Sequence, residues 1–181
     1  MEQYIKKATG ILEEKYFKIE ERDDLSDDQK VGEIIKITSA VCAGVAIQPI
    51  PFADILVLTP IQAFMGSRIA KIRGVPVKDN DITTYIKEIG GGVGLGLFAQ
   101  QLAIGAYKTV LPVLGSLTST IPLVYGLTYG IGRVIDAYVI SKKKGTDLSP
   151  EEMMTIWDKA KKEGKKESNK KISKEFAEKI S

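Results

Sequence analysis

The stretch from Ile89 to Gly132 constrains the fold most, because its 44 residues carry a single charged side chain, Lys108. So long an uncharged stretch belongs either in the core of a helical bundle or in a bilayer. Residues 89–107 and 110–132 each have about the 20 residues that a spanning helix needs, although glycines, glutamines and prolines lower their hydropathy. Basic residues flank the stretch on both sides, which fits a hairpin over residues 89–140 with both ends in the cytosol. A membrane hairpin and a soluble bundle core are both open.

Glycine recurs at every fourth position within this hairpin, and that spacing lets two helix backbones approach closely. The first glycines also look like a phosphate-binding loop, but their spacing is not Gly-x-Gly-x-x-Gly, no predicted strand precedes them and no Gly-Lys-Ser/Thr follows. We therefore expect helix packing and no nucleotide site. The predicted packing residues are Gly90, Gly92, Gly94, Gly96, Gly126 and Gly130.

Helix start and stop signals divide the N-terminal part of the chain. Ser26 with Gln29 forms a capping-box pattern, and Pro49 with Pro51 ends the helix that it starts. Pro60 predicts a kink or a restart inside the next helix. We expect three helices here, at residues 3–21, from the Ser26 cap to about Ile47, and from about Phe52 to Ile72, the last closed by Gly74.

The C-terminal part begins with a second strong helix start, Ser149 and Pro150 followed by Glu152. The helix that follows has an apolar stripe that includes Trp157, and we expect the Trp157 side chain to contact a partner protein. The last stripe, Ile172, Phe176 and Ile180, lies among Lys, Glu and Ser, so we expect fraying there. No segment shows the alternation of apolar and polar residues that is typical of a β-strand, so we predict an all-α fold. We expect a helical bundle with a Gly-rich apolar hairpin and a charged amphipathic C-terminal helix.

Charge divides the chain into three parts. Residues 1–33 carry 6 basic and 10 acidic side chains, residues 34–141 carry 8 and 5, and residues 142–181 carry 12 and 8. A basic tail either meets phosphates or anionic lipid, or is the solvated face of a helix with alternating Lys and Glu. We expect an N-terminal amphipathic helix at 1–32, a helical domain at 33–141 and a basic helical tail at 142–181.

The composition excludes several classes of chemistry. The chain has no histidine and one cysteine, Cys42, so it offers no Ser/His/Asp or Cys/His arrangement, no intramolecular disulfide and no usual zinc set. We expect no metal, no cofactor and no enzymatic activity. The tail lysines alternate with acids, which disfavours nucleic-acid binding. The first residues lack an apolar core, so we expect no secretory signal and a cytoplasmic setting.

Asp54 is the one acidic side chain in an otherwise apolar, proline-flanked run. It is either a catalytic acid without an evident partner, or a carboxylate in the first helical turn that free backbone N–H groups satisfy. We favour the structural interpretation.

A family resemblance rests on these same motifs. Gln48 to Asp54, Leu58 to Gln62 and Ile69 to Val75, with Leu111 to Ser116 and Tyr125 to Arg133 later, resemble the YcjF-like family of helical domains of unknown function. The resemblance covers residues 33–141, and its motif residues are Pro49, Pro51, Asp54 and Gln62.

The resemblance implies an α-helical, often membrane-associated accessory module, found alone or C-terminal to Era-like GTPase domains. This chain has no Gly-x-x-x-x-Gly-Lys-Ser/Thr and no Asn-Lys-x-Asp, so GTP hydrolysis is not carried over. We expect a non-enzymatic module at the cytoplasmic face of the membrane, peripheral or hairpin-inserted, self-associating and accessory to a GTPase. The alternative is a soluble helical adaptor for a partner protein.

Overall fold

The computed structural model describes residues 2–48, 53–75 and 117–181, and the secondary structure that these residues form is helical. The predicted all-α bundle is confirmed, and no strand occurs among the described residues. The helices are α1 (Glu2–Glu20), α2 (Asp27–Ala46), α3 (Ala53–Ile72), α5 (Leu117–Lys143), α6 (Pro150–Glu167) and α7 (Lys170–Ile180).

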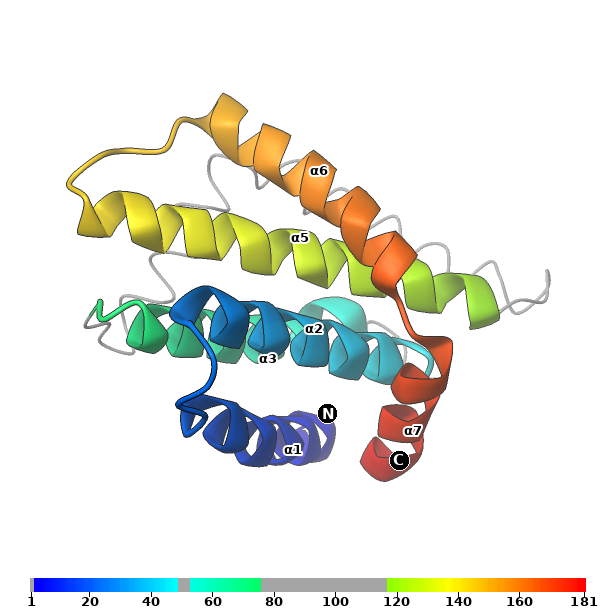
Figure 1. Cartoon of the computed structure of the whole chain (residues 1–181). Coiled ribbons are helices and arrows are strands. Elements are labelled where there is room, and N and C mark those ends of the chain that lie inside the picture. The colour runs from blue at the N-terminus through cyan, green and yellow to red at the C-terminus, as the bar shows by residue number, and fades with distance from the viewer. Residues whose placement is uncertain (1, 49–52, 76–116) are drawn as a thin grey trace.

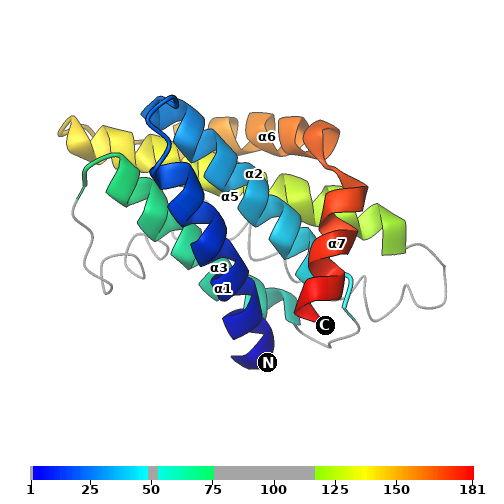
Figure 2. The same ribbon diagram turned by 60° about the horizontal axis from the view of Figure 1, so that its bottom comes forward.

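Two helices, α2 and α5, form the centre of the bundle (Figure 1). Helix α2 packs against α1, α3, α5 and α7, and α5 packs against α2, α3 and α6. Helix α6 lies on the side of α5 that faces away from α1, as both ribbon views show (Figures 1 and 2). The long apolar helix is therefore enclosed between layers of the same chain.

The helix ends follow the sequence signals. The Ser26 hydroxyl accepts the Gln29 backbone N–H at 3.3 Å, and the Gln29 side chain accepts the Ser26 N–H at 2.9 Å. Ser149 and Glu152 make the same reciprocal pair at 3.2 and 2.8 Å. Gly74 ends α3 at φ +69°, a conformation that favours glycine. All three predicted signals are confirmed.

Helix α3 runs through Pro60 without a break, so the restart does not occur, and the kink that the sequence equally predicts there stays a prediction. Proline lacks the N–H for one helical hydrogen bond and costs about 3 kcal/mol inside a helix. Pro60 is exposed, whereas Val57, Ile61 and Met65 on either side of it are buried in the core. Burial of these side chains on both sides of the proline outweighs the lost hydrogen bond.

The end of the chain does not fray as expected but forms α7, which packs on α2. Phe176 and Ile180 of the predicted stripe are buried, whereas Ile172 is exposed. The buried face includes Ser173 and Ala177 instead. Small side chains are favoured there because the two helices approach closely at Gly44 of α2, which no local pattern in the tail reveals.

Candidate functional site

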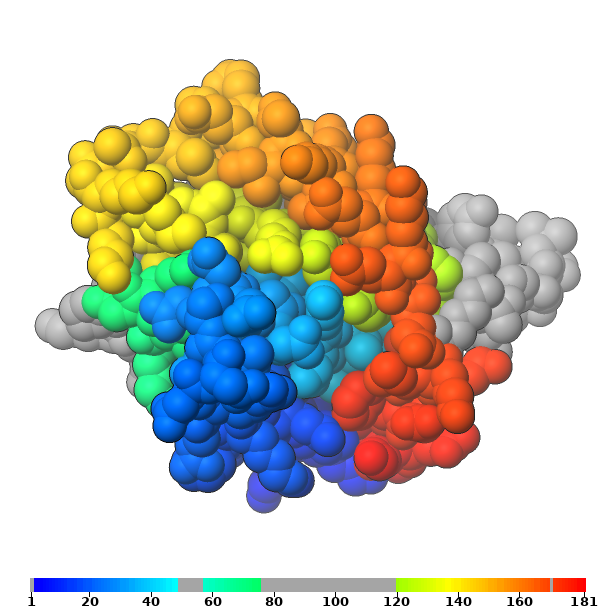
Figure 3. Space-filling view, in the orientation of Figure 1, coloured from blue at the N-terminus to red at the C-terminus, as the bar shows by residue number. Residues whose placement is uncertain are grey.

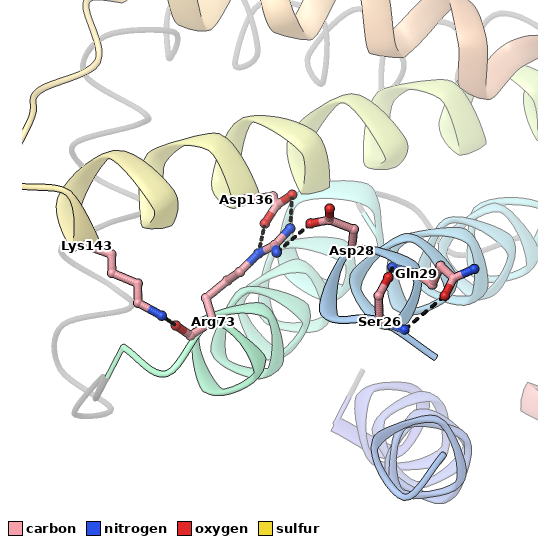
Figure 4. Close-up of polar contacts among 6 residues, drawn as sticks. All are labelled: Ser26, Asp28, Gln29, Arg73, Asp136 and Lys143. Carbon is pink, nitrogen blue, oxygen red and sulfur yellow. Dashed lines mark hydrogen bonds and ion pairs between the residues drawn. The ribbon is translucent and has the colours of Figure 1, made fainter. Parts of the chain in front are cut away.

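A cluster of charged side chains joins three helices at one end of the bundle (Figure 4). Arg73, just beyond the end of α3, donates to both carboxylate oxygens of Asp136 on α5, from Nε at 2.7 Å and from Nη2 at 2.9 Å. Its Nη1 donates to Asp28 in the first turn of α2 at 2.6 Å. Lys143 of α5 donates to the Arg73 carbonyl at 2.6 Å. We call these four residues the Arg73 cluster.

Within the Arg73 cluster, the Arg73–Asp136 pair is shielded from water, whereas Asp28 and Lys143 are exposed. The Arg73 and Asp136 side chains are 12% and 11% exposed, whereas Asp28 is 84% exposed. The hydrogen bonds that Arg73 donates to Asp136 raise the pKa of the guanidinium, with a further contribution from Asp28, so Arg73 stays charged. A bidentate pair of this kind satisfies both groups at once. Both carboxylate oxygens of Asp136 are therefore engaged by Arg73 within the fold.

Cys42 lies at the centre of the core, where α2, α3 and α5 meet. Burial raises the pKa of its thiol to about 12, and a hydrogen bond with Thr128 only partly opposes this effect. Gln62, one of the predicted motif residues, donates to the Thr128 hydroxyl at 3.3 Å. A thiol that stays protonated at neutral pH is not a nucleophile. These side chains fix the core and offer no reactive group.

The predicted packing glycines on α5 lie where α6 crosses it. A Cβ on Gly126 would lie 2.7 Å from the Lys161 carbonyl oxygen, and one on Gly130 would lie 2.7 Å from the Trp157 ring. Gly164 of α6 faces the same contact, where its Cβ would lie 2.6 Å from Tyr129. The helix that packs on these glycines is thus α6, which the glycine spacing alone does not identify.

Trp157 is 1% exposed against α5, so the expectation that its ring contacts a partner does not fit this structure. Its ring covers Gly130, and the Lys161 ammonium lies 3.9 Å from the ring centroid. The Trp157 side chain is a core residue of the α5–α6 contact.

The other predicted site residues are only partly described. Asp54 is the second residue of α3, in its first turn as predicted, and its side chain lies outside the described part. Pro49 and Pro51 lie outside the described residues, and so do the four remaining glycines of the predicted hairpin, Gly90, Gly92, Gly94 and Gly96. Among the residues that the structure describes, no group of three or more acidic or cysteine side chains is placed to hold a metal ion.

Helix α5 is the one described helix that is long and apolar enough to cross a membrane, over residues 120–143. In its most apolar window, 78% of the residues are buried within the bundle. A core helix of a soluble protein has the same composition. The helix therefore meets the length requirement for a span while it serves as the core of this fold.

The outer face of α6 carries three exposed lysines, Lys159, Lys162 and Lys166. Their spacing of three and four puts them on one side of the helix, opposite the buried Trp157 and Ala160. None of the three forms an ion pair with another described residue. Figure 3 shows α6 along the upper edge of the molecule, at the surface. We call these three residues the α6 lysine face.

Comparison with known proteins adds no functional information: no family model, curated protein or solved structure matches the chain. The resemblance to the YcjF-like family and the GTPase partner that it implies therefore stay predictions. Sequence reasoning identified Gln62 and the α5 glycines but not the Arg73 cluster. The available signal for that cluster was a pair of opposite charges, Arg73 and Asp136, near the ends of apolar helices.

Proposed function

We propose that the protein is a non-enzymatic helical module that binds the anionic cytoplasmic face of a membrane peripherally, with α5 kept inside the bundle. The observation that carries the proposal is the α6 lysine face: Lys159, Lys162 and Lys166 are exposed on one side of α6, where they outnumber the one exposed acid among them, Glu163, and form no ion pair with a described residue. Lysines near an anionic lipid surface contribute about 1 kcal/mol each to binding. A face of three thus supports weak, salt-sensitive attachment.

The packing of α5 favours peripheral attachment over a hairpin insertion. To enter a bilayer, α5 would leave α2, α3 and α6 and separate Asp136 from Arg73. Breaking a buried charge pair costs about 3–5 kcal/mol before any apolar contact is lost. The lysine face needs no such rearrangement, because it is already exposed on the outer helix.

The described residues contain no catalytic set, which is compatible with a binding module but is not evidence for one. A non-enzymatic role is supported by the interior, where the charged and reactive side chains already interact with other residues of the chain. Asp136 is bound by Arg73, and Cys42 lies beside Thr128 with a raised pKa. These interactions stabilise the fold, so binding of a membrane or a partner would use side chains on the surface.

Vesicle flotation tests the proposal. The protein is mixed with vesicles of phosphatidylcholine, with or without phosphatidylglycerol, at low and high salt. We expect flotation only with the anionic vesicles, and its loss at high salt because exposed charges are screened. Replacing Lys159, Lys162 and Lys166 with glutamine should weaken binding roughly 100-fold, from about 1 kcal/mol per lysine.

The control replaces three exposed lysines of α1, Lys6, Lys7 and Lys18, with glutamine; of these, Lys18 is paired with Glu14. It makes the same change in net charge on a different helix. Equal loss of binding in both triple variants would refute the lysine face and leave only non-specific attraction. Flotation that survives high salt and alkaline extraction would instead favour insertion of the hairpin.

A soluble adaptor is the second candidate, favoured by one observation on α1. Phe17 is 59% exposed, and with Ile172 it is one of the two large hydrophobic side chains found exposed among the described residues. An exposed aromatic ring is a common anchor in protein interfaces. Failure of the protein to float with anionic vesicles at low salt would reject membrane binding and leave this candidate.

A further inference from the structure

The connection between α6 and α7 is two residues long, Ser168 and Asn169, and contains neither glycine nor proline. At this point the chain turns, so that α7 leaves the direction of α6 and lies beside α2 (Figures 1 and 2). The turn is held by Asn169, whose side chain accepts the backbone N–H groups of Lys171 at 3.0 Å and Ile172 at 3.2 Å. Nothing in the residue types of the turn forbids a helix.

The position of α7 on α2 is built for close contact. A Cβ on Gly44 would lie 2.7 Å from the Ser173 carbonyl oxygen and 3.0 Å from the Ala177 nitrogen, so only glycine allows this approach. One turn later, Gln48 donates to the Ala177 carbonyl at 2.9 Å and accepts from the Ser181 hydroxyl at 3.1 Å. We call this surface, defined by Gly44 on α2 and by Gln48 just beyond its end, the α7 seat.

Helix α7 depends on the α7 seat for its stability. It has 11 residues, and helices below about 12–15 residues are marginal on their own in water. Its apolar side chains Phe176 and Ile180 are buried in the docked position. An α7 that leaves its seat would expose these side chains and uncover Gly44. Both α7 and the α7 seat regain their contacts when α7 binds the α7 seat of another copy.

We propose that two copies of the chain exchange α7, each placing it in the α7 seat of the other. Ser168 and Asn169 become helical, α6 and α7 join into one helix over residues 150–180, and the contacts with Gly44 and Gln48 form between chains. The contacts of the α7 seat identify the helix that it binds from the other copy as α7: Gly44 packs against Ser173 and Ala177, and Gln48 forms hydrogen bonds with the end of the helix. Exchange of an identical element is a route to dimers that requires no new interface.

Lys170 gives a specific way to block the exchange. It is the first residue of α7, a position where proline is well tolerated. Asn169 accepts from residues 171 and 172 and not from 170, so Lys170→Pro keeps the cap. In a continuous helix the same proline would lie in the interior, where it should lower the dimer association constant at least roughly 100-fold. Lys170→Ala is the matched control.

Cross-linking across the seat measures the exchange. A Gln48→Cys/Ser181→Cys protein loses the hydrogen bonds of Gln48 equally in both arrangements but keeps the close contact at Gly44. After this protein is refolded from urea at high concentration, a short bismaleimide joins the two cysteines. Docking within one chain yields cross-linked monomers, and exchange yields covalent dimers on a denaturing gel. Cys42 does not interfere, because it is buried with a raised pKa.

We expect covalent dimers in this background, more of them with Ser168→Ala/Asn169→Ala, and few with Lys170→Pro. Cross-linked monomers alone at the highest concentration, without any further change, would overturn the proposal. So would dimers that persist in Lys170→Pro at the level of Lys170→Ala. Neither of these two outcomes depends on the alanine double variant, so the test stands even where that variant fails to fold.

Discussion

The contact between α5 and α6 makes a quantitative prediction for Gly126→Ala. The added Cβ would lie 2.7 Å from the Lys161 carbonyl oxygen and 3.2 Å from the Lys165 nitrogen, both backbone atoms of α6. Backbone atoms of a packed helix do not move aside as a flexible side chain does. The substitution should therefore push α6 away from α5 or strain both helices.

Two effects of opposite sign decide the magnitude. Overpacking of this kind costs about 1–3 kcal/mol, while replacing a mid-helix glycine with alanine gains about 1 kcal/mol of helix propensity. We expect a net loss of about 1 kcal/mol for Gly126→Ala. Gly10 in α1 has no atom within 4 Å of its Cβ position, so Gly10→Ala should gain about 1 kcal/mol.

Urea unfolding followed by circular dichroism measures both variants, with the midpoint and the slope fitted together. Gly66→Ala is an intermediate case, because its nearest neighbour, the Ile135 side chain, lies at an ordinary contact distance of 3.5 Å. The expected order of stability is Gly10→Ala above Gly66→Ala above Gly126→Ala. Equal gains at all three positions would refute the close approach of α5 and α6.

Three further predictions concern the interior and the caps. Arg73→Ala should destabilise the fold by about 3 kcal/mol because Asp136 is left unpaired. Asp28→Asn should cost under about 1 kcal/mol because the Asp28 side chain is 84% exposed. Urea unfolding measures the stability of both variants. The unfolding free energy should fall as pH rises from 9 to 12, since burial raises the Cys42 pKa from 9.0 to about 12 and the unfolded chain loses its proton first. Cys42→Ala should show a smaller fall over this range. Ser149→Ala should cost about 1 kcal/mol of thermal or urea stability by removing the α6 cap.

The helices with explicit end signals could be predicted from the sequence. The capping pairs at Ser26 and Ser149 are local patterns within four residues, and Gly74 supplies the left-handed conformation that ends α3. Local hydrogen bonds determine these ends, so a single sequence contains the information. The all-α class followed from the same signals and from the absence of a period-two pattern.

The contacts between distant residues could not be predicted. Arg73 and Asp136 are 63 residues apart, and Gln48 and Ala177 are 129 apart, so their pairing depends on how whole helices pack. Trp157 shows the same limit: its stripe indicated a helix face, but only the packing reveals that Gly130 receives the ring. Burial converts this residue from an expected partner contact into a core residue.

The emission of Trp157 on vesicles tests most directly whether α5 stays in the bundle when the protein binds a membrane. It is the only tryptophan in the chain and lies between α5 and α6. We predict that its emission maximum and its quenching by acrylamide do not change when anionic vesicles bind the protein. A shift of the emission maximum on binding would mean that α5 has left α6, and it would contradict peripheral binding by an intact bundle.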